Sequence, residues 1–143
     1  MASLFNNFAK SRFADGTFDW DTDDMRILLV DSTTTVDTED DVTSLSGYST
    51  LGEISGTGYA RKALTGRTVT TDTANNRAEL DADDITFTGI TAGTTIGMLI
   101  FKFVDGTAAN DLPVAFSEFA APIVTNGGDL TITVDVEGML QLT

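Results

Sequence analysis

The sequence predicts a mainly β protein, a β-sandwich or small barrel of about eight or nine short antiparallel strands with one short N-terminal helix. Three observations lead to this prediction. Short apolar or alternating runs recur along the chain, clusters of Gly, Asn, Asp and Ser separate them, and helical spacing of apolar residues marks only the N-terminal segment. A chain of 143 residues suits one hydrophobic core, so residues 1–143 are expected to form a single β domain.

The N-terminal segment, residues 1–16, is expected to form a helix or an arm. Ser3 could cap the helix, and Asp15-Gly16 would end it. This segment could close one end of the sandwich or reach out to a partner protein. Its side chains at three- and four-residue spacing are Leu4, Phe5, Phe8, Ala9, Arg12 and Phe13.

The next segments are predicted to supply a central strand and a long loop. Met25 to Val30 is apolar and ends at Asp31, which is typical of a strand buried on both faces and central in its sheet. Phe18 and Trp20, just before it, are expected to fill the core behind the helix. Residues 33–55 are polar with isolated apolar positions, which indicates a long loop excursion with one helical turn around residues 41–46.

Two further strands are predicted at Gly56 to Arg61 and at Arg67 to Asp72, with a tight hairpin turn at Asn75-Asn76. The glycines of the first resemble a phosphate-binding loop only superficially, because no helix follows and the surroundings are acidic. We expect these glycines to permit a bulge or a close backbone approach instead.

The second half of the chain is predicted to hold the remaining strands, with Asp83-Asp84 at a bend and Pro113 and Pro122 at strand margins. A terminal hairpin is expected, with Glu137-Gly138 as its turn. The predicted strands are Ala78 to Ala82, Ile85 to Gly89, Met98 to Val104, Val114 to Phe119, Leu130 to Val136 and Met139 to Leu142.

Composition excludes several classes of function. The chain has 8 basic and 22 acidic residues, a formal charge of −14, and neither histidine nor cysteine. Its acidity disfavours nucleic acid and anionic lipid as partners. Lack of histidine and cysteine removes the common catalytic triads and the usual zinc ligands, so we expect no enzyme and predict no catalytic, cofactor-binding or metal-binding residue. The longest apolar stretch, Met98 to Phe101, is too short to span a bilayer, and the N-terminus does not resemble a secretory signal, so a soluble protein made in the cytoplasm is expected.

Two groups of charged residues leave alternatives open. Asp19 to Asp24, Glu39 to Asp41 and Asp81 to Asp84 could bind calcium, but none has EF-hand spacing, and their carboxylates could instead cap turns and strand ends. Four of the eight basic residues could form a positive patch or pair with nearby acids. They are Arg61, Lys62, Arg67 and Arg77.

Three segments together resemble a widespread set of small structural proteins of tailed bacteriophages and prophages. They are Phe13 to Val30 with Asp40-Asp41-Val42, Ala78 to Thr88, and the closing Asn126-Gly127-Gly128-Asp129-Leu130-Thr131-Ile132. The resemblance covers nearly the whole chain. It departs from the family pattern at Val134, where relatives tend to have Trp, and at Phe101-Lys102-Phe103, where a Tyr and a more polar strand end are expected.

This resemblance implies a virion protein that is assembled in the host cytoplasm. The first expectation is a capsid cement or decoration protein that binds the outer face of the major capsid shell and stabilises it. The implied partners are the major capsid protein and other copies of the chain, as a homotrimer, with no nucleic acid and no membrane. Alternatives are a tail tube or tail-tip subunit and, from another class, a calcium- or carbohydrate-binding module.

Overall fold

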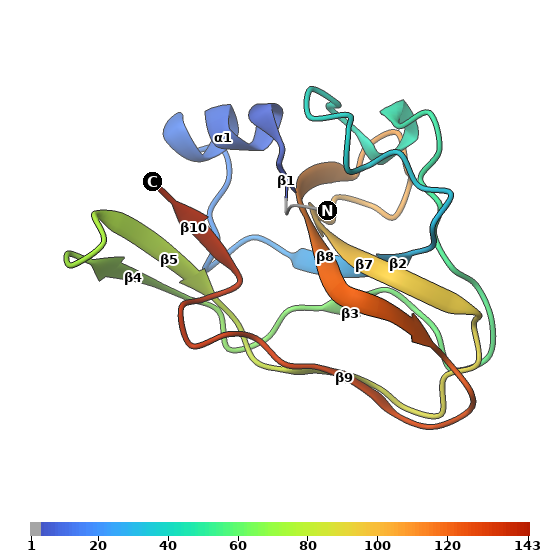
Figure 1. Cartoon of the computed structure of the whole chain (residues 1–143). Helices are drawn as coiled ribbons and strands as arrows, with labels where there is room; N and C mark the ends of the chain where they lie inside the picture. Colours follow the sequence, from blue (N-terminus) through green and yellow to red (C-terminus); the bar gives the residue numbers. More distant parts are fainter. Residues whose placement is uncertain (1–3) are drawn as a thin grey trace.

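Three antiparallel sheets organise the chain in the computed structural model, which describes residues 4–143 (Figure 1). The mainly β prediction is confirmed, although the described residues form ten strands rather than eight or nine. The elements are β1 (Leu4–Phe5), α1 (Asn7–Ala14), β2 (Met25–Val30), a 3₁₀ turn η1 (Leu45–Gly47), β3 (Lys62–Ala63), β4 (Thr68–Asp72), β5 (Arg77–Asp81), β6 (Ile85–Phe87), β7 (Thr94–Lys102), β8 (Leu112–Val124), β9 (Leu130–Ile132) and β10 (Leu140–Leu142).

The largest sheet has five strands in the order β1-β8-β7-β2-β3, and β2 lies inside it. The prediction that Met25–Val30 is a central strand buried on both faces is confirmed. Leu28 and Val30 pack into one core, whereas Ile27 and Leu29 pack into another on the opposite face. The alternation of side chains along a strand puts consecutive residues into these two cores.

The larger of these cores lies between the five-stranded sheet, α1 and the two smaller sheets. Phe18 and Trp20 are buried in it, as the sequence predicted. The indole Nε1 of Trp20 donates a hydrogen bond to the backbone oxygen of Asp81 at 2.8 Å, which joins the segment before β2 to the end of β5.

The other core is covered by the predicted excursion, residues 33–55, and not by a sheet. Val36, Leu45 and Tyr48 are buried there against Leu99 and the ring of Phe101. Burial raises the pKa of Tyr48 to about 12. The excursion has its helical turn at Leu45–Gly47, and its apolar side chains pack on the sheet.

The N-terminal helix begins later than predicted. Leu4 and Phe5 form β1, which pairs with Phe116 and Ala115 of β8. Asn6 caps the helix, because its side chain accepts a hydrogen bond from Ala9 N. The predicted cap, Ser3, lies outside the described residues. Backbone pairing with β8 thus takes the residues that helical spacing had assigned to the first turn.

The predicted strand at Gly56 to Arg61 is wrong. Thr57 forms only an isolated bridge with Thr91, and the next strand begins at Lys62. Gly58 has a φ of +75°, and a Cβ there would meet the carbonyl oxygen of Gly89 at 2.6 Å. The close backbone approach that we expected of these glycines is therefore present, but positive φ is incompatible with a regular strand.

The predicted terminal hairpin is also wrong. β9 pairs with β6, and β10 pairs with β5. A turn from Asp135 to Gly138 exists, since Gly138 N donates to Asp135 O at 2.9 Å. However, β5 and β6 are separated by the Asp83-Asp84 bend, and the C-terminal segment runs back along both of them. Long-range pairing with these two strands therefore replaces the local pairing that the alternation suggested.

Candidate protein-binding surface

β8 leaves its regular pairing with β7 in its C-terminal half. Gly97 pairs with Glu118, but the next ladder pair is Thr95 with Ile123, so residues 119–122 lie opposite Ile96 alone. Extra residues on one strand form a bulge and leave the hydrogen-bond ladder. Pro122 is compatible with this position because a bulged residue needs no ladder N–H.

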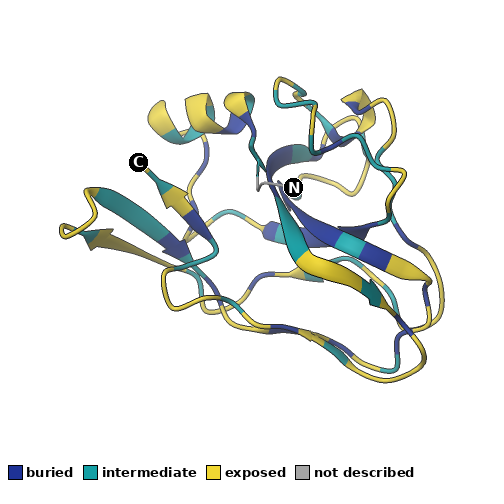
Figure 2. Ribbon diagram, in the orientation of Figure 1, coloured by how far each residue is buried: buried dark blue, intermediate teal, exposed yellow. Residues whose placement is uncertain are grey.

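The bulge exposes apolar side chains. We call residues 119–124 (Phe-Ala-Ala-Pro-Ile-Val) the β8 strip. Ala120, Ala121 and Pro122 are exposed, and Val124 keeps 69% of its surface accessible. In Figure 2 this stretch is the exposed part of the long β8 arrow, beside the buried β7. Contiguous exposed apolar surface of this kind often marks a protein interaction site.

The strip borders a cavity of about 240 Å³ that is lined by Ile96 and by residues 118–122. This cavity could receive an apolar side chain of a partner. The predicted strand ended at Phe119, and of the strip residues beyond it only Pro122 was named, as a proline at a strand margin. The available signal was the apolar run, which continues through Pro122 to Val124.

A second cavity, of about 320 Å³, lies between β1 and β10. It is lined by Leu4, Phe5, Ala115, Phe116 and residues 138–141, none of which has a titratable side chain. A third, of about 370 Å³, contains Asp31 and Glu53. Asp31 accepts hydrogen bonds from Thr33, and Glu53 is bound by Tyr59 and Arg61. Both carboxylates of the third cavity are thus committed to bonds within the chain.

The acidic segments considered for calcium are engaged in turns and ion pairs. Asp19 accepts from the backbone N–H of Asp21, and Asp23 is bound by Lys102 at 2.7 Å. Asp84 accepts from Val134 N at 2.8 Å. These contacts fit the interpretation in which carboxylates cap turns and strand ends. In residues 4–143 no three His, Cys, Asp or Glu side chains gather closely enough to hold a metal ion.

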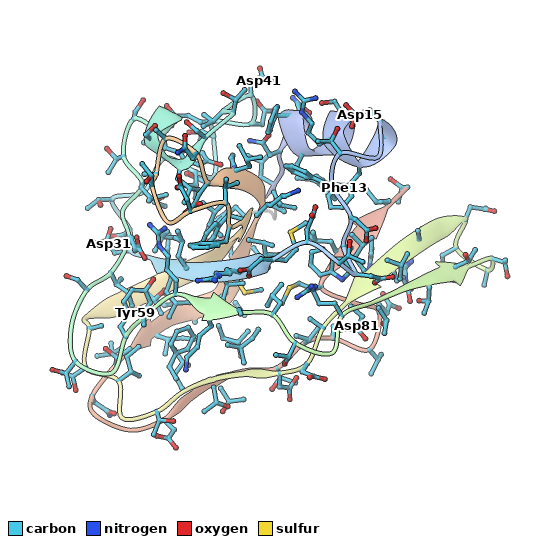
Figure 3. The ribbon with its side chains drawn as sticks, turned by 180° about the vertical axis from the view of Figure 1, so that it is seen from behind. Phe13, Asp15, Asp31, Asp41, Tyr59 and Asp81 are labelled. Atoms are coloured by element: carbon cyan, nitrogen blue, oxygen red, sulfur yellow. The ribbon has the colours of Figure 1, made fainter. Side chains whose placement is uncertain are left out.

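Glu39, in the excursion, follows the same pattern. Its carboxylate accepts hydrogen bonds from the Ser49 hydroxyl, the Thr35 hydroxyl and Ser49 N. These donors lower the pKa of Glu39 below its ordinary value, the Ser49 hydroxyl contributing most. Figure 3 shows the labelled Asp15, Asp31 and Asp41 spread around the periphery of the molecule, and they do not converge on one site.

The arginines at positions 61, 67 and 77 each bind different partners and do not form one patch. Arg61 pairs with Glu53 at 2.7 Å, and Arg77 pairs with Asp72 at 3.1 Å. Arg67 instead donates to backbone oxygens, among them those of Trp20 and Asp23, at 2.7 Å each. Pairing with acids is thus observed for Arg61 and Arg77. Arg67 ties the acidic segment before β2 to the start of β4.

One buried ionic cluster was not anticipated. Asp111 is fully buried, and its Oδ1 accepts hydrogen bonds from the backbone N–H groups of Val104, Asp105 and Gly106. Its Oδ2 has no hydrogen-bond partner and lies 3.5 Å from the Arg61 guanidinium. The hydrogen bond with Glu53 raises the pKa of Arg61. Its backbone donors belong to the same loop between β7 and β8, and only Arg61 comes from a distant segment.

No family model, curated protein or solved structure matches this chain. None of the helical segments in residues 4–143 has the length and apolar character that crossing a membrane requires. Among the described residues, the β8 strip with its cavity is an exposed apolar surface that suits a protein partner.

Proposed function

We propose that the chain is a structural protein of a tailed-bacteriophage virion and that it acts as a capsid cement protein without catalytic activity. The sequence resemblance is the reason for proposing a tailed-bacteriophage virion. The observation that carries the proposal of a protein partner is the β8 strip, an uncharged apolar surface on a domain of net charge −14. The centres of protein interfaces are depleted of charged residues in the same way.

The charge supports a position on the outer face of the shell. The inner face meets packaged DNA, which repels a domain with a formal charge of −14. The outer face has no such cost. In this proposal the chain is assembled into the virion in the host cytoplasm, its partners are the major capsid protein and other copies of itself as a homotrimer, and neither nucleic acid nor membrane is bound.

Binding to purified empty capsids tests the proposal. The chain should co-sediment with the shells, and Val124→Asp should weaken binding by about tenfold or more, because the interface would bury an unpaired carboxylate. Val136→Asp is the matched control, since Val136 is 96% exposed and lies outside the strip. Equal binding by the two variants and the unchanged protein would overturn the assignment of the strip.

The position in the particle is a separate test. Antibodies against the chain should label heads of intact particles, and cryo-electron microscopy should place it on the outer surface of the shell. Labelling confined to tails would reject the cement role in favour of a tail tube or tail-tip subunit.

A further inference from the structure

The three-stranded sheet, in the order β10-β5-β4, ends in an open edge. β4 pairs with β5 on one side, and no other strand in residues 4–143 pairs with it. Figure 1 shows the β4–β5 hairpin projecting from the body of the molecule. Alternate N–H and C=O groups along β4 therefore point away from β5 and are available to a further strand.

β4 itself lacks the features that usually protect such an edge. Its exposed residues Thr68, Val69, Thr70 and Thr71 include no charge and no proline. Five consecutive pairs join β4 to β5 without a register shift, so no bulge twists the edge away. Since lysine, proline and bulges are the common means of keeping another chain from an edge strand, the backbone of β4 is open to strand addition.

One face of the hairpin has acidic side chains beside this edge. Thr68 pairs with Asp81, and Thr70 pairs with Glu79, so these four side chains lie on the same face. Leu80, between the two acids, is buried on the opposite face. Because threonine side chains are short, long side chains of a strand added beyond β4 can pass over them toward the two carboxylates.

The first end of β4 is acidic as well. Arg67 is turned inward, where its guanidinium donates to the backbone oxygens of Asp21 and Asp23. Asp83 lies at the same end, since its carboxylate accepts a hydrogen bond from the Thr65 hydroxyl. Within residues 4–143, Asp23 alone of these three aspartates is in an ion pair. The inward guanidinium therefore leaves an excess of carboxylates around this end.

The other end of β4 has the same sign. Asp72, the last residue of the strand, shares the single guanidinium of Arg77 with Glu79 and Glu137. One cation faces three carboxylates, so this end is also net negative. A second copy of the chain is a poor occupant of the edge, because its β4 is uncharged and both of its ends are acidic.

We propose that β4 binds an extended segment of another protein that has Lys or Arg at alternate positions and β-branched residues between them. Alternate side chains of the added strand would lie on the face of Asp81 and Glu79. The carboxylates are two strand spacings away, about 9–10 Å between backbones, which a long basic side chain and a carboxylate span together. Main-chain hydrogen bonds would supply the attachment, and the acidic face would select basic partners.

This surface is separate from the β8 strip, and the proposal does not depend on capsid binding. It makes a specific statement about salt. Attraction between a basic segment and an acidic face is screened over about 10 Å at 0.1 M ionic strength. Binding should therefore weaken as the salt concentration rises.

Peptide titration followed by fluorescence anisotropy tests the proposal. The probe is a labelled peptide of sequence Lys-Val-Lys-Val-Lys-Val-Lys with blocked ends. A Lys-Pro-Lys-Pro-Lys-Pro-Lys peptide has the same charge but no N–H at its prolines, and it should bind about tenfold or more weakly. A peptide with Glu in place of Lys should not bind. Equal binding of the valine and proline peptides, or no binding of the valine peptide at low salt, would overturn the proposal.

Two variants of the chain locate the contact. Thr70→Lys, in the middle of β4, should weaken binding of the valine peptide by about tenfold or more, because a lysine on the edge repels a basic strand. Thr73→Lys makes the same charge change on the exposed turn of the same hairpin and should have little effect. Circular dichroism should show both variants folded. Equal weakening by the two lysines would contradict binding along β4.

A third pair of variants tests the acidic face. Asp81→Asn keeps an acceptor for Ala82 N but removes the charge, and it should weaken peptide binding about two- to fivefold. Asp41→Asn is the matched control, since Figure 3 shows Asp41 far from Asp81. Equal affinities of these two variants would contradict selection by the acidic face. Val124→Asp, in the β8 strip, should leave peptide binding unchanged, so that this test and the capsid test can fail separately.

Discussion

β2 and β4 are both strands, but β2 is apolar whereas β4 is rich in threonine, and they occupy opposite environments. β2 has neighbouring strands on both sides and contributes side chains to two cores, and Ile27, Leu28, Leu29 and Val30 are each 0% exposed. β4 has one neighbour, and Val69 is 49% exposed. The comparison indicates that burial around β2 stabilises the fold, whereas the β4 hairpin is free to make contacts with other molecules.

The largest expected effect tests the two-sided burial of β2. Leu28→Ala and Leu29→Ala remove side chains from opposite faces of the sheet, and each should lower the free energy of unfolding by about 2–5 kcal/mol. Urea denaturation followed by circular dichroism measures the change. If only one variant were destabilised, one of the two cores would not contribute, and β2 would resemble an ordinary half-buried strand.

The next effect concerns the loop-covered side of β2. Asp111→Ala should lower the free energy of unfolding by about 2–3 kcal/mol, because three backbone N–H groups lose their buried acceptor and Arg61 loses a partner. Asp105→Ala is the control. Asp105 is exposed, and its carboxylate accepts hydrogen bonds from Thr107 N and Asn110 Nδ2 within its own loop, so its loss should cost less than about 1 kcal/mol. Equal losses for the two variants would show that burial of Asp111 does not matter.

A smaller, pH-dependent effect is expected in residues 33–55, the excursion that covers the face of β2 with Leu28 and Val30. The pKa of Glu39 is lowered in the folded state, so its contribution to stability is complete above its unfolded pKa of about 4.3 and disappears as the pH falls through the folded value. Glu39→Gln should therefore reduce the difference between the urea midpoints at pH 7 and pH 3. If the variant showed the same difference between its urea midpoints as the unchanged protein, the loss of stability in acid would come from other carboxylates.

The smallest effect is expected in β4. Val69→Ala should change the free energy of unfolding by less than about 1 kcal/mol, because the exposed side chain supports only the local strand preference. The same urea measurement as for Leu28→Ala compares the two strands directly. A loss as large as that in β2 would mean that β4 is packed in solution, which self-association could produce, and dilution should then remove the excess.

Local patterns predicted much of the fold. The buried run Met25–Val30, the core positions of Phe18 and Trp20, and the turn at Asn76, whose φ is +53°, follow from residues near in sequence. The candidate surface was not predicted. The β8 bulge depends on how β7 pairs with β8, and the register of two distant strands is not encoded by either strand alone.

The sequence by itself determined the mainly β class, the acidity and the positions of the strongest strands, because these depend on composition and on spacing within a few residues. Only the tertiary structure decided which strands pair, which face of each is buried and which edges stay open. The alternation in Leu130–Val136 and the following turn predicted a hairpin, but β9 pairs with β6 and β10 pairs with β5, so the two expected arms lie in different sheets. The physical reason is that hydrogen-bond partners and packing surfaces come from the whole chain, so local spacing can predict a strand without identifying the strand that pairs with it.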